Sequence, residues 1–339
     1  MIIASARRLL CAVFGVLALA PAASAAELGF VTDLNWGISD ADKERTYSGL
    51  GDLGARWVRV TANWAELERE RGVRSAWSLD QLDGAVRRNL AAGRRVVVSL
   101  YAAPQWASGS TYQYTPPRDV NDYARFAGFL AARYRGLGVA GYEVWNEPNI
   151  SRFWGWRTPS APEYVSLLRA SFGALRAGDP AARVVFGGLS TGDAAYMRAA
   201  YAAGAKDRFD VMDVHPYTCD SDITVPANGR KGAFLGYRDV RAVQIQKSDP
   251  TPMWFTEFGW STTTQYCGVS EAAQAERLAT AARLMAQNTY VRAAMWYTQR
   301  NPYWGGDADN LESRWGVLTT TWRPKPAYAK FKALATAGL

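Results

Sequence analysis

Short β-branched or aromatic runs alternate with longer segments of helical period throughout this 339-residue sequence. This alternation is typical of βαβ units, whose parallel strands are covered on both faces and read as near-continuous apolar runs. Eight candidate strands stand at residues 28–31, 57–61, 95–100, 141–145, 184–187, 211–215, 253–256 and 293–297. Eight strand–helix pairs predict an α/β protein with a (β/α)8 TIM barrel. A doubly wound sheet is the structural alternative.

The segments between these strands carry helix signals of their own. Ser78 followed by Gln81 forms a capping-box pattern, which predicts a helix start. Leu79, Leu82 and Val86 then mark one apolar face at helical spacing. Such stripes indicate packing against the sheet, not function.

The first 25 residues resemble an export signal. Arg7 and Arg8 precede an apolar stretch over residues 9–20, and residues 23–25 (Ala-Ser-Ala) supply a small-residue cleavage site. The apolar stretch is too short to span a bilayer, and no later segment reaches ~18 uninterrupted apolar residues. We therefore expect a signal peptide at 1–25 and a secreted, extracellular or periplasmic chain with no membrane anchor; an uncleaved anchor is the alternative. No linker divides residues 26–339, which predicts one catalytic domain, and we expect a monomer.

Charge and histidine content exclude several function classes. Loss of Arg7 and Arg8 would lower the formal charge from +8 to +6, and the remaining basic residues form no clustered stripe, so no nucleic-acid partner is expected. A basic surface could serve an anionic polysaccharide or simply solubility. His215 is the single histidine, so we expect no metal and no cofactor.

Two glutamates stand at predicted strand ends, where a TIM barrel carries its reactive residues. The fourth strand ends in Trp145-Asn146-Glu147-Pro148, and the seventh ends in Thr256-Glu257-Phe258-Gly259-Trp260. Pro148 disfavours a helical backbone at the preceding residue, so the strand is expected to continue up to Glu147.

These motifs resemble clan A of the glycoside hydrolases, whose members carry an Asn-Glu-Pro acid/base motif after strand four and a nucleophilic glutamate after strand seven. Asn149 followed by residues 153–155 (Phe-Trp-Gly) is most similar to family 39 and related bacterial exopolysaccharide endoglycosidases. The resemblance spans residues 26–339 and implies Glu147 as acid/base and Glu257 as nucleophile of a retaining enzyme. Some clan members place a histidine on strand three, where this sequence has residues 99–104 (Ser-Leu-Tyr-Ala-Ala-Pro). The extra β-sandwich of longer family relatives is not expected here, so their substrate preference is not carried over.

Environment must keep the two carboxyls in opposite protonation states. Arg59, which ends strand two, and Tyr217, which follows strand six, would both favour the ionised form of Glu257. A second carboxylate close by would keep the proton on Glu147. The alternative is that Arg59 only forms an ion pair within the core and has no role in the site.

The family pattern assigns further residues to the substrate. Asn146 is expected to hydrogen-bond the sugar 2-hydroxyl, His215 to orient the groups around it, and Trp296 to form the floor of the sugar subsite. The alternatives are that His215 is a buried histidine with no role in the site and that Trp296 only fills the core. Many aromatic residues fall in predicted loops and predict a long carbohydrate cleft: Trp64, Trp106, Trp154, Trp156, Trp260, Trp304, Tyr112, Tyr114 and Tyr303.

Cys219 and Cys267 follow the predicted sixth and seventh strands, so their loops should be neighbours. An exported chain lies in a compartment that permits disulfides, and we expect these two to form one.

Two other functions compete with a glycosidase. Residues 188–192 (Gly-Leu-Ser-Thr-Gly) satisfy the nucleophile-elbow pattern of serine hydrolases around Ser190, although His215, the one possible base, follows too soon. An aromatic cleft could also bind carbohydrate without cutting it. We expect instead a β-linked polysaccharide or oligosaccharide substrate cut internally, with an exo-acting β-xylosidase or β-glucosidase as the alternative.

Overall fold

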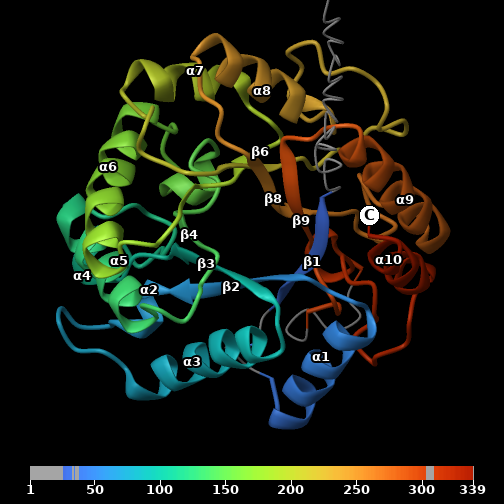
Figure 1. The fold of residues 1–339 in the computed structure, drawn as a ribbon, viewed down its shortest axis with the longest axis horizontal. Helices are drawn as coiled ribbons and strands as arrows, with labels where there is room; N and C mark the ends of the chain where they lie inside the picture. Colours follow the sequence, from blue (N-terminus) through green and yellow to red (C-terminus); the bar gives the residue numbers. More distant parts are fainter. Residues whose placement is uncertain (1–25, 33, 35–37, 303–308, 339) are drawn as a thin grey trace, which may run out of the picture.

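The computed structural model describes residues 26–32, 34, 38–302 and 309–338; the predicted signal peptide lies outside them. Within this part of the chain, parallel strands form one sheet in the order β5-β4-β3-β2-β1-β9-β8-β7-β6 (Figure 1). The strands are β1 (Glu27–Thr32), β2 (Trp57–Asn63), β3 (Arg95–Tyr101), β4 (Gly141–Val144), β5 (Val184–Phe186), β6 (Leu189–Ser190), β7 (Met212–His215), β8 (Met253–Phe258) and β9 (Val291–Trp296).

Each predicted strand is present. The predicted fifth strand is β5, and the chain then continues into the short β6, so the predicted sixth, seventh and eighth strands are β7, β8 and β9. Val185 in β5 bridges Val211 in parallel, and Phe186 N donates to Val211 O (3.0 Å). Consecutive strands thus follow one another around the sheet and the first pairs with the last, which is a TIM-barrel-like order and not that of a doubly wound sheet.

Helices surround the sheet (Figure 1). They are α1 (Asp40–Asp52), α2 (Trp64–Leu67), α3 (Ala76–Ala91), α4 (Gln105–Ser108), α5 (Val120–Arg133), α6 (Ala161–Gly178), α7 (Ala194–Ala202), α8 (Gly236–Gln246), α9 (Glu271–Ala286) and α10 (Pro326–Thr336), with 3-10 turns η1 (Ser151–Trp154) and η3 (Leu311–Ser313). Among the described residues, no helix has the length and apolar character needed to cross a membrane.

The start of α3 corrects the predicted capping box. Ser75, not Ser78, is the N-cap, because the Ser75 side chain accepts a hydrogen bond from Ser78 N. The apolar face is as expected, with Leu79, Leu82 and Val86 buried. The helix therefore begins one turn earlier than the sequence pattern indicates.

Two apolar clusters fill the fold. One lies between strands and helices, as in the contact of the Phe30 ring in β1 with Phe331 in α10 (centroids 4.2 Å apart). The other lies inside the ring of strands and consists of Val31, Trp57, Val97, Val185, Val211, Trp254, Ala293 and Met295. Charged side chains are buried in the same interior, notably Arg59 and Glu143. Arg59 also lines the cavity described next.

Candidate active site

A cavity of about 650 Å³ opens at the carboxyl ends of the strands. Both Glu147 and Glu257 line it, and one carboxylate oxygen of each lies within 4.8 Å of the other and of a ring nitrogen of His215. Its other lining residues include Arg59, Thr61, Tyr101, Tyr114, Asn146, Arg152, Phe153, Ser190, Tyr217, Trp260, Tyr266, Tyr297, Glu312 and Trp315. The structure therefore brings the two predicted carboxyls to one cavity at the expected end of the sheet.

Glu257 is held as a carboxylate. Arg59 Nη1 donates to its Oε1 (2.5 Å), and the Tyr217 hydroxyl donates to its Oε2 (2.9 Å). Burial by itself raises the pKa of this carboxyl. The positive charges of His215 and Arg59, with the tyrosine hydrogen bond, outweigh burial and hold the pKa below the ordinary glutamate value. An ionised carboxylate at the cavity wall is the form that a nucleophile requires.

Arg59 is fixed by four further contacts. Its Nε and Nη2 bind the two oxygens of Glu143 (2.7 and 2.9 Å), and Nη2 also reaches Ser99 Oγ (3.0 Å) and Asn146 Oδ1 (2.7 Å). Burial lowers the pKa of this guanidinium, but Glu143 and Glu257 outweigh it and raise the pKa well above the ordinary value. Asn146 lines the cavity, and because Arg59 engages its oxygen, its NH2 group is left as a donor for a ligand.

His215 connects Glu147 to a second buried carboxylate. Its Nδ1 lies 3.0 Å from Glu147 Oε1, and its Nε2 lies 2.9 Å from Thr256 Oγ1. The Thr256 hydroxyl donates to Asp213 Oδ2 (2.5 Å), so it must accept from Nε2–H. Nδ1 is then the ring nitrogen that faces Glu147, and it donates to Oε1 when the ring is protonated. Burial lowers the His215 pKa, but the charge of Glu257 and contacts with Asp213 and Glu147 raise it well above the ordinary value.

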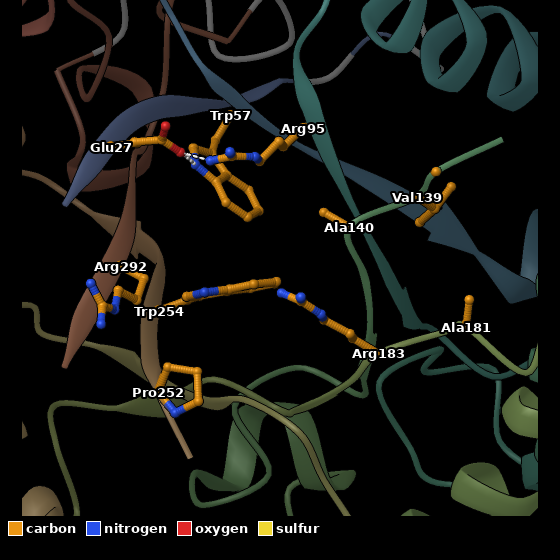
Figure 2. A pocket seen from close by; sticks show the side chains of 11 residues that line it. Glu27, Trp57, Arg95, Val139, Ala140, Ala181, Arg183, Pro252, Trp254 and Arg292 are labelled. Carbon is orange, nitrogen blue, oxygen red and sulfur yellow. Dashed lines mark hydrogen bonds and ion pairs between the residues drawn. The ribbon is translucent and has the colours of Figure 1, made fainter. Parts of the chain in front are cut away.

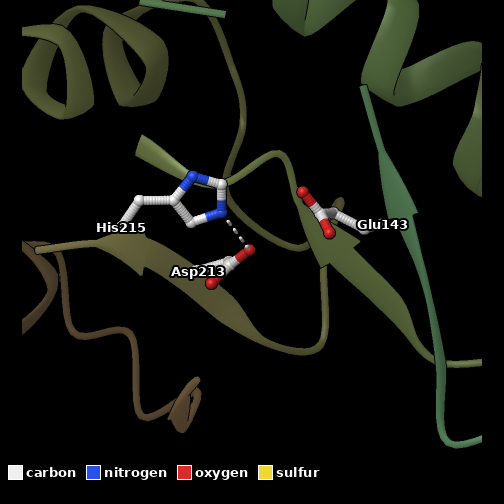
Figure 3. A group of neighbouring side chains, drawn as sticks. All are labelled: Glu143, Asp213 and His215. Carbon is white, nitrogen blue, oxygen red and sulfur yellow. Dashed lines mark ion pairs between the residues drawn. The ribbon is translucent and has the colours of Figure 1, made fainter. Parts of the chain in front are cut away.

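Glu143 and Asp213 lie beside His215 in the interior of the ring (Figure 3). These three groups are close enough together to hold a metal ion. However, Arg59 already donates to both oxygens of Glu143, and Thr256 donates to both oxygens of Asp213 through its N–H and hydroxyl. The carboxylate oxygens therefore serve as acceptors of these hydrogen bonds. Sequence reasoning missed both acids, although a charge inside an apolar strand run is a recognisable signal.

The backbone at Glu147 contradicts the expected extended strand. β4 ends at Val144, Trp145 has a φ of 68°, and Glu147 has a φ of 42°. Left-handed conformations are costly for such residues, by about 1–3 kcal/mol. Trp145 is held by contacts away from the strand, since its backbone N donates to the Tyr123 hydroxyl (3.0 Å) and its Nε1 donates to Phe153 O (2.7 Å). Glu147 is held by Ile150 N, which donates to its carbonyl (3.2 Å), and by His215 Nδ1 at its carboxylate (3.0 Å), and these contacts accompany the departure from the preference set by Pro148.

Three predicted sugar contacts are corrected. Trp296 is fully buried and donates from Nε1 to Trp315 O (3.0 Å), Trp154 is buried among core rings, and Trp106 donates to Glu68 O (2.9 Å); none lines the cavity. Each ring instead fills space between loops and helices. Trp64 is likewise core, whereas Trp260 reaches the cavity wall although its ring is almost fully buried. Tyr303 and Trp304 lie outside the described residues.

Other aromatic residues take these positions. Tyr297, one residue beyond Trp296, lines the cavity, and its ring contacts that of Trp315 (centroids 5.9 Å). Tyr101 and Tyr114 form the opposite part of the wall with Phe153. The cleft is therefore aromatic, as predicted, but largely through residues that sequence reasoning did not assign.

The serine-hydrolase alternative is wrong. Ser190 lines the cavity, but both ring nitrogens of His215 face other partners, Glu147 and Thr256. The backbone of Ser190 is clamped by the Asn149 side chain, whose oxygen accepts from Ser190 N (2.9 Å). His215, the base that the serine-hydrolase reading requires, is therefore not available to Ser190.

The predicted disulfide is confirmed: Cys219 and Cys267 are bonded, with Cα atoms 4.7 Å apart, and both line the cavity. The bridge closes a loop with a sequence separation of 48 residues.

Removing this bridge should destabilise the protein. A closed loop of this length stabilises by about 2–4 kcal/mol. We expect the Cys219→Ser/Cys267→Ser double variant to lose that much unfolding free energy in denaturant titrations. Thiol titration of the denatured, unreduced exported protein should find neither Cys219 nor Cys267 as a free thiol; detection of both as thiols would contradict the bridge.

A second cavity, of about 520 Å³, lies at the amino-terminal end of the strands (Figure 2). Trp57, Trp254 and Arg183 line it, and its one lining carboxylate, Glu27, is paired with Arg95. It offers no pair of carboxyls, so the chemistry belongs to the opposite end.

Comparison with known proteins agrees with this site. The family model for cellulase (glycosyl hydrolase family 5) matches residues 22–301. The chain belongs to this family. No curated protein matches it. The fold is similar to that of a family 39 glycoside hydrolase from Bacteroides cellulosilyticus WH2, which aligns with a TM-score of 0.74 and 20% identity over 93% of this chain. The chain spans 64% of that protein's length.

Two further solved structures show the same fold. A GH5_18 structure from Streptomyces cattleya, in complex with GlcNAc, aligns with a TM-score of 0.73 and 21% identity over 93% of this chain and 80% of that one. A monomeric β-xylosidase from Caulobacter crescentus CB15 aligns with a TM-score of 0.68 and 18% identity over 92% of this chain and 69% of that one. Families 5 and 39 both belong to clan A, so this family 5 member belongs to the predicted clan.

Proposed function

We propose that this family 5 member is a retaining β-glycosidase with Glu257 as nucleophile and Glu147 as acid/base. The observation that carries the proposal is the separation of the two carboxylates, whose oxygens lie within 4.8 Å. Retaining enzymes hold their carboxyls about 5–5.5 Å apart, whereas inverting enzymes need about 6.5–9.5 Å for an intervening water. The ion pair and hydrogen bond on Glu257 support the division of roles.

The reaction proceeds in two displacements. Glu257 Oε attacks the anomeric carbon while Glu147 gives its proton to the glycosidic oxygen, so the C–O bond to the leaving group breaks. Glu147, now ionised, takes a proton from water, which attacks the anomeric carbon and releases Glu257. His215 orients Glu147 through Nδ1, and Asn146 supplies an N–H donor for the sugar 2-hydroxyl.

Stereochemistry tests the mechanism. Proton NMR at early times should show the β-anomer as the first product from a β-linked substrate, before mutarotation. Initial appearance of the α-anomer would refute retention, even if both glutamates proved essential.

The mode of attack is proposed to be endo, on a β-linked polysaccharide. Aromatic residues along the wall, such as Tyr114, Phe153 and Tyr297, support several sugar subsites. One observation favours the exo alternative of a β-xylosidase or β-glucosidase. Arg152 pairs with Glu312 (2.8 Å), and both line the cavity on loops after β4 and β9. An ion pair between these two loops would close one end of the cleft, as an exo-acting enzyme requires. Chromatography of early products decides, since monosaccharide as the one early product would exclude endo action.

We further propose that residues 1–25 direct export and that the mature chain is a monomeric, closed (β/α)8 barrel. The bridge between Cys219 and Cys267 supports an oxidising compartment, and the Val185–Val211 contact supports closure. Amino-terminal sequencing of the exported protein should begin at Ala26 or Glu27. A retained leader would contradict cleavage.

The acid limb of the pH profile should report Glu257. Its pKa is lowered, so kcat/KM should fall only as pH drops through a value below that of an ordinary glutamate. Tyr217→Phe removes one donor to the carboxylate, which raises this pKa and moves the acid limb to higher pH. Tyr266→Phe, at the exposed rim of the cavity, is the control and should leave the limb in place. An unchanged limb in Tyr217→Phe would contradict the assignment.

A further inference from the structure

Trp156 is exposed to an unusual degree for its type. Its side chain is 66% accessible, whereas most tryptophan rings in the described structure are buried or half-buried. Leaving so large an apolar surface in water costs free energy, and a flat exposed ring that other rings connect to a cavity is a surface on which a ligand can stack. The position follows η1, in the same loop that begins at Glu147 after β4.

The backbone holds the ring in this exposed position. Gly155 and Trp156 have φ values of 67° and 59°, so two successive residues are left-handed. Trp156 N donates to Ser151 O (2.8 Å), and Gly155 N donates to Tyr114 O (3.1 Å). A non-glycine residue is strained in this region, and such strain is retained mainly at functional sites. The exposure is therefore built into the loop.

A continuous row of rings joins Trp156 to the catalytic cavity. Its ring stacks on Tyr112 (centroids 5.7 Å, 28°), and Tyr112 contacts Tyr114 edge-on (5.3 Å, 84°). Tyr114 contacts Phe153 (4.9 Å), and these last two rings line the cavity. The Tyr112 hydroxyl also donates to Arg152 O (3.0 Å), which ties this row to η1.

We propose that Trp156 forms an outer subsite, which stacks on a pyranose unit of a β-linked oligosaccharide beyond the catalytic cavity. Tyr112 covers part of the ring, and the exposed part offers a flat apolar surface to the C–H face of a sugar. This inference rests on the proposed function and adds to it an extended substrate, longer than the cavity itself holds.

The experiment compares short and long substrates. The variants are Trp156→Ala, Trp156→Tyr as the conservative change, and Trp77→Ala as the matched control, since Trp77 on α3 is 55% exposed and does not line the cavity. The short substrates are 4-nitrophenyl β-xyloside, β-glucoside and β-mannoside. The long substrates are β-1,4-linked xylo-, cello- and mannohexaose.

We expect Trp156→Ala to lower kcat/KM on the hexasaccharide that the wild type cleaves by about five- to tenfold, the scale of one aromatic contact. Hydrolysis of the 4-nitrophenyl glycosides should not change, Trp156→Tyr should recover most of the loss, and Trp77→Ala should match the wild type. Wild-type kcat/KM of Trp156→Ala on the hexasaccharide would overturn the subsite and leave the glycosidase standing. An equal loss on short and long substrates would also overturn it, because the effect would then be structural.

Binding separates the two proposals if no substrate is cleaved. Calorimetric titration of the same hexasaccharides into Glu257→Gln and into Glu257→Gln/Trp156→Ala measures the subsite without turnover. Weaker binding in the double variant would support the subsite, while the lack of cleavage by the wild type would refute the hydrolytic function for these sugars. Equal binding of the two variants would overturn the subsite. Absence of binding to all three would refute both.

Discussion

Glu257→Gln should lower kcat by about four orders of magnitude or more on every substrate, because an amide cannot form the glycosyl-enzyme. Glu147→Gln should cause a similar loss on substrates with a poor leaving group, which need its proton. On dinitrophenyl glycosides its kcat/KM should fall much less, because the first displacement of that leaving group needs no proton. Steady-state kinetics on both substrate types measure the difference. Both variants should keep the wild-type circular dichroism spectrum.

Glu312→Gln is the matched control, since this carboxylate also lines the cavity but lies on η3 and pairs with Arg152. It should retain turnover on 4-nitrophenyl glycosides. Azide should rescue Glu257→Ala and Glu147→Ala with glycosyl azides of opposite anomeric configuration. Near-normal turnover in either Gln variant would end the assignment.

Arg59→Met should both inactivate and destabilise the enzyme. The guanidinium is the shared partner of two carboxylates, Glu143 and Glu257, and it is almost fully buried. Its removal leaves Glu143 without its ionic partner, and breaking a buried pair in this way costs about 3–5 kcal/mol. It also removes a charge that lowers the Glu257 pKa, so we expect kcat/KM to fall about 100-fold or more and the acid limb to move to higher pH.

Arg95→Met is the control for the ion pair. Arg95 pairs with Glu27 at the opposite end of the sheet, where both side chains are partly exposed, and such pairs contribute about 0–1 kcal/mol. Denaturant titration should therefore separate the two variants clearly. Equal stability of Arg59→Met and Arg95→Met would show that the buried cluster has no structural role.

The strands could be predicted because burial on both faces makes them apolar runs that stand out from amphipathic helices. The break between β5 and β6 could not, because it depends on a distant residue. A Cβ on Gly188 would lie 2.0 Å from Nε2 of His215, so the chain needs a glycine there to seat a ring that comes 27 positions later. No local pattern carries that requirement.

The same limit explains the errors at the site. Successive residues of a strand point to opposite faces. At the end of β9 this places Met295 and Tyr297 inside the ring of strands and Trp296 outside. The predicted sugar contact, Trp296, lies one residue before Tyr297, so the prediction named a core residue in place of a cavity residue. The two glutamates were predictable because their motifs are specific. The backbone turn at Trp145 and Glu147 was not, because these residues contact others distant in the sequence, such as Tyr123 at Trp145 and His215 at Glu147.

Trapping of the glycosyl-enzyme tests the central assignment most directly. Glu147→Gln is mixed with the 2,4-dinitrophenyl β-glycoside that the wild type hydrolyses fastest, among the xyloside, glucoside and mannoside, and the reaction is quenched in acid within seconds. The first displacement proceeds without an acid, but the second lacks its base, so the intermediate should accumulate. Peptide mass spectrometry should find one added glycosyl unit on Glu257. A label on another residue, or release of hemiacetal in the α-configuration with no label, would contradict the account.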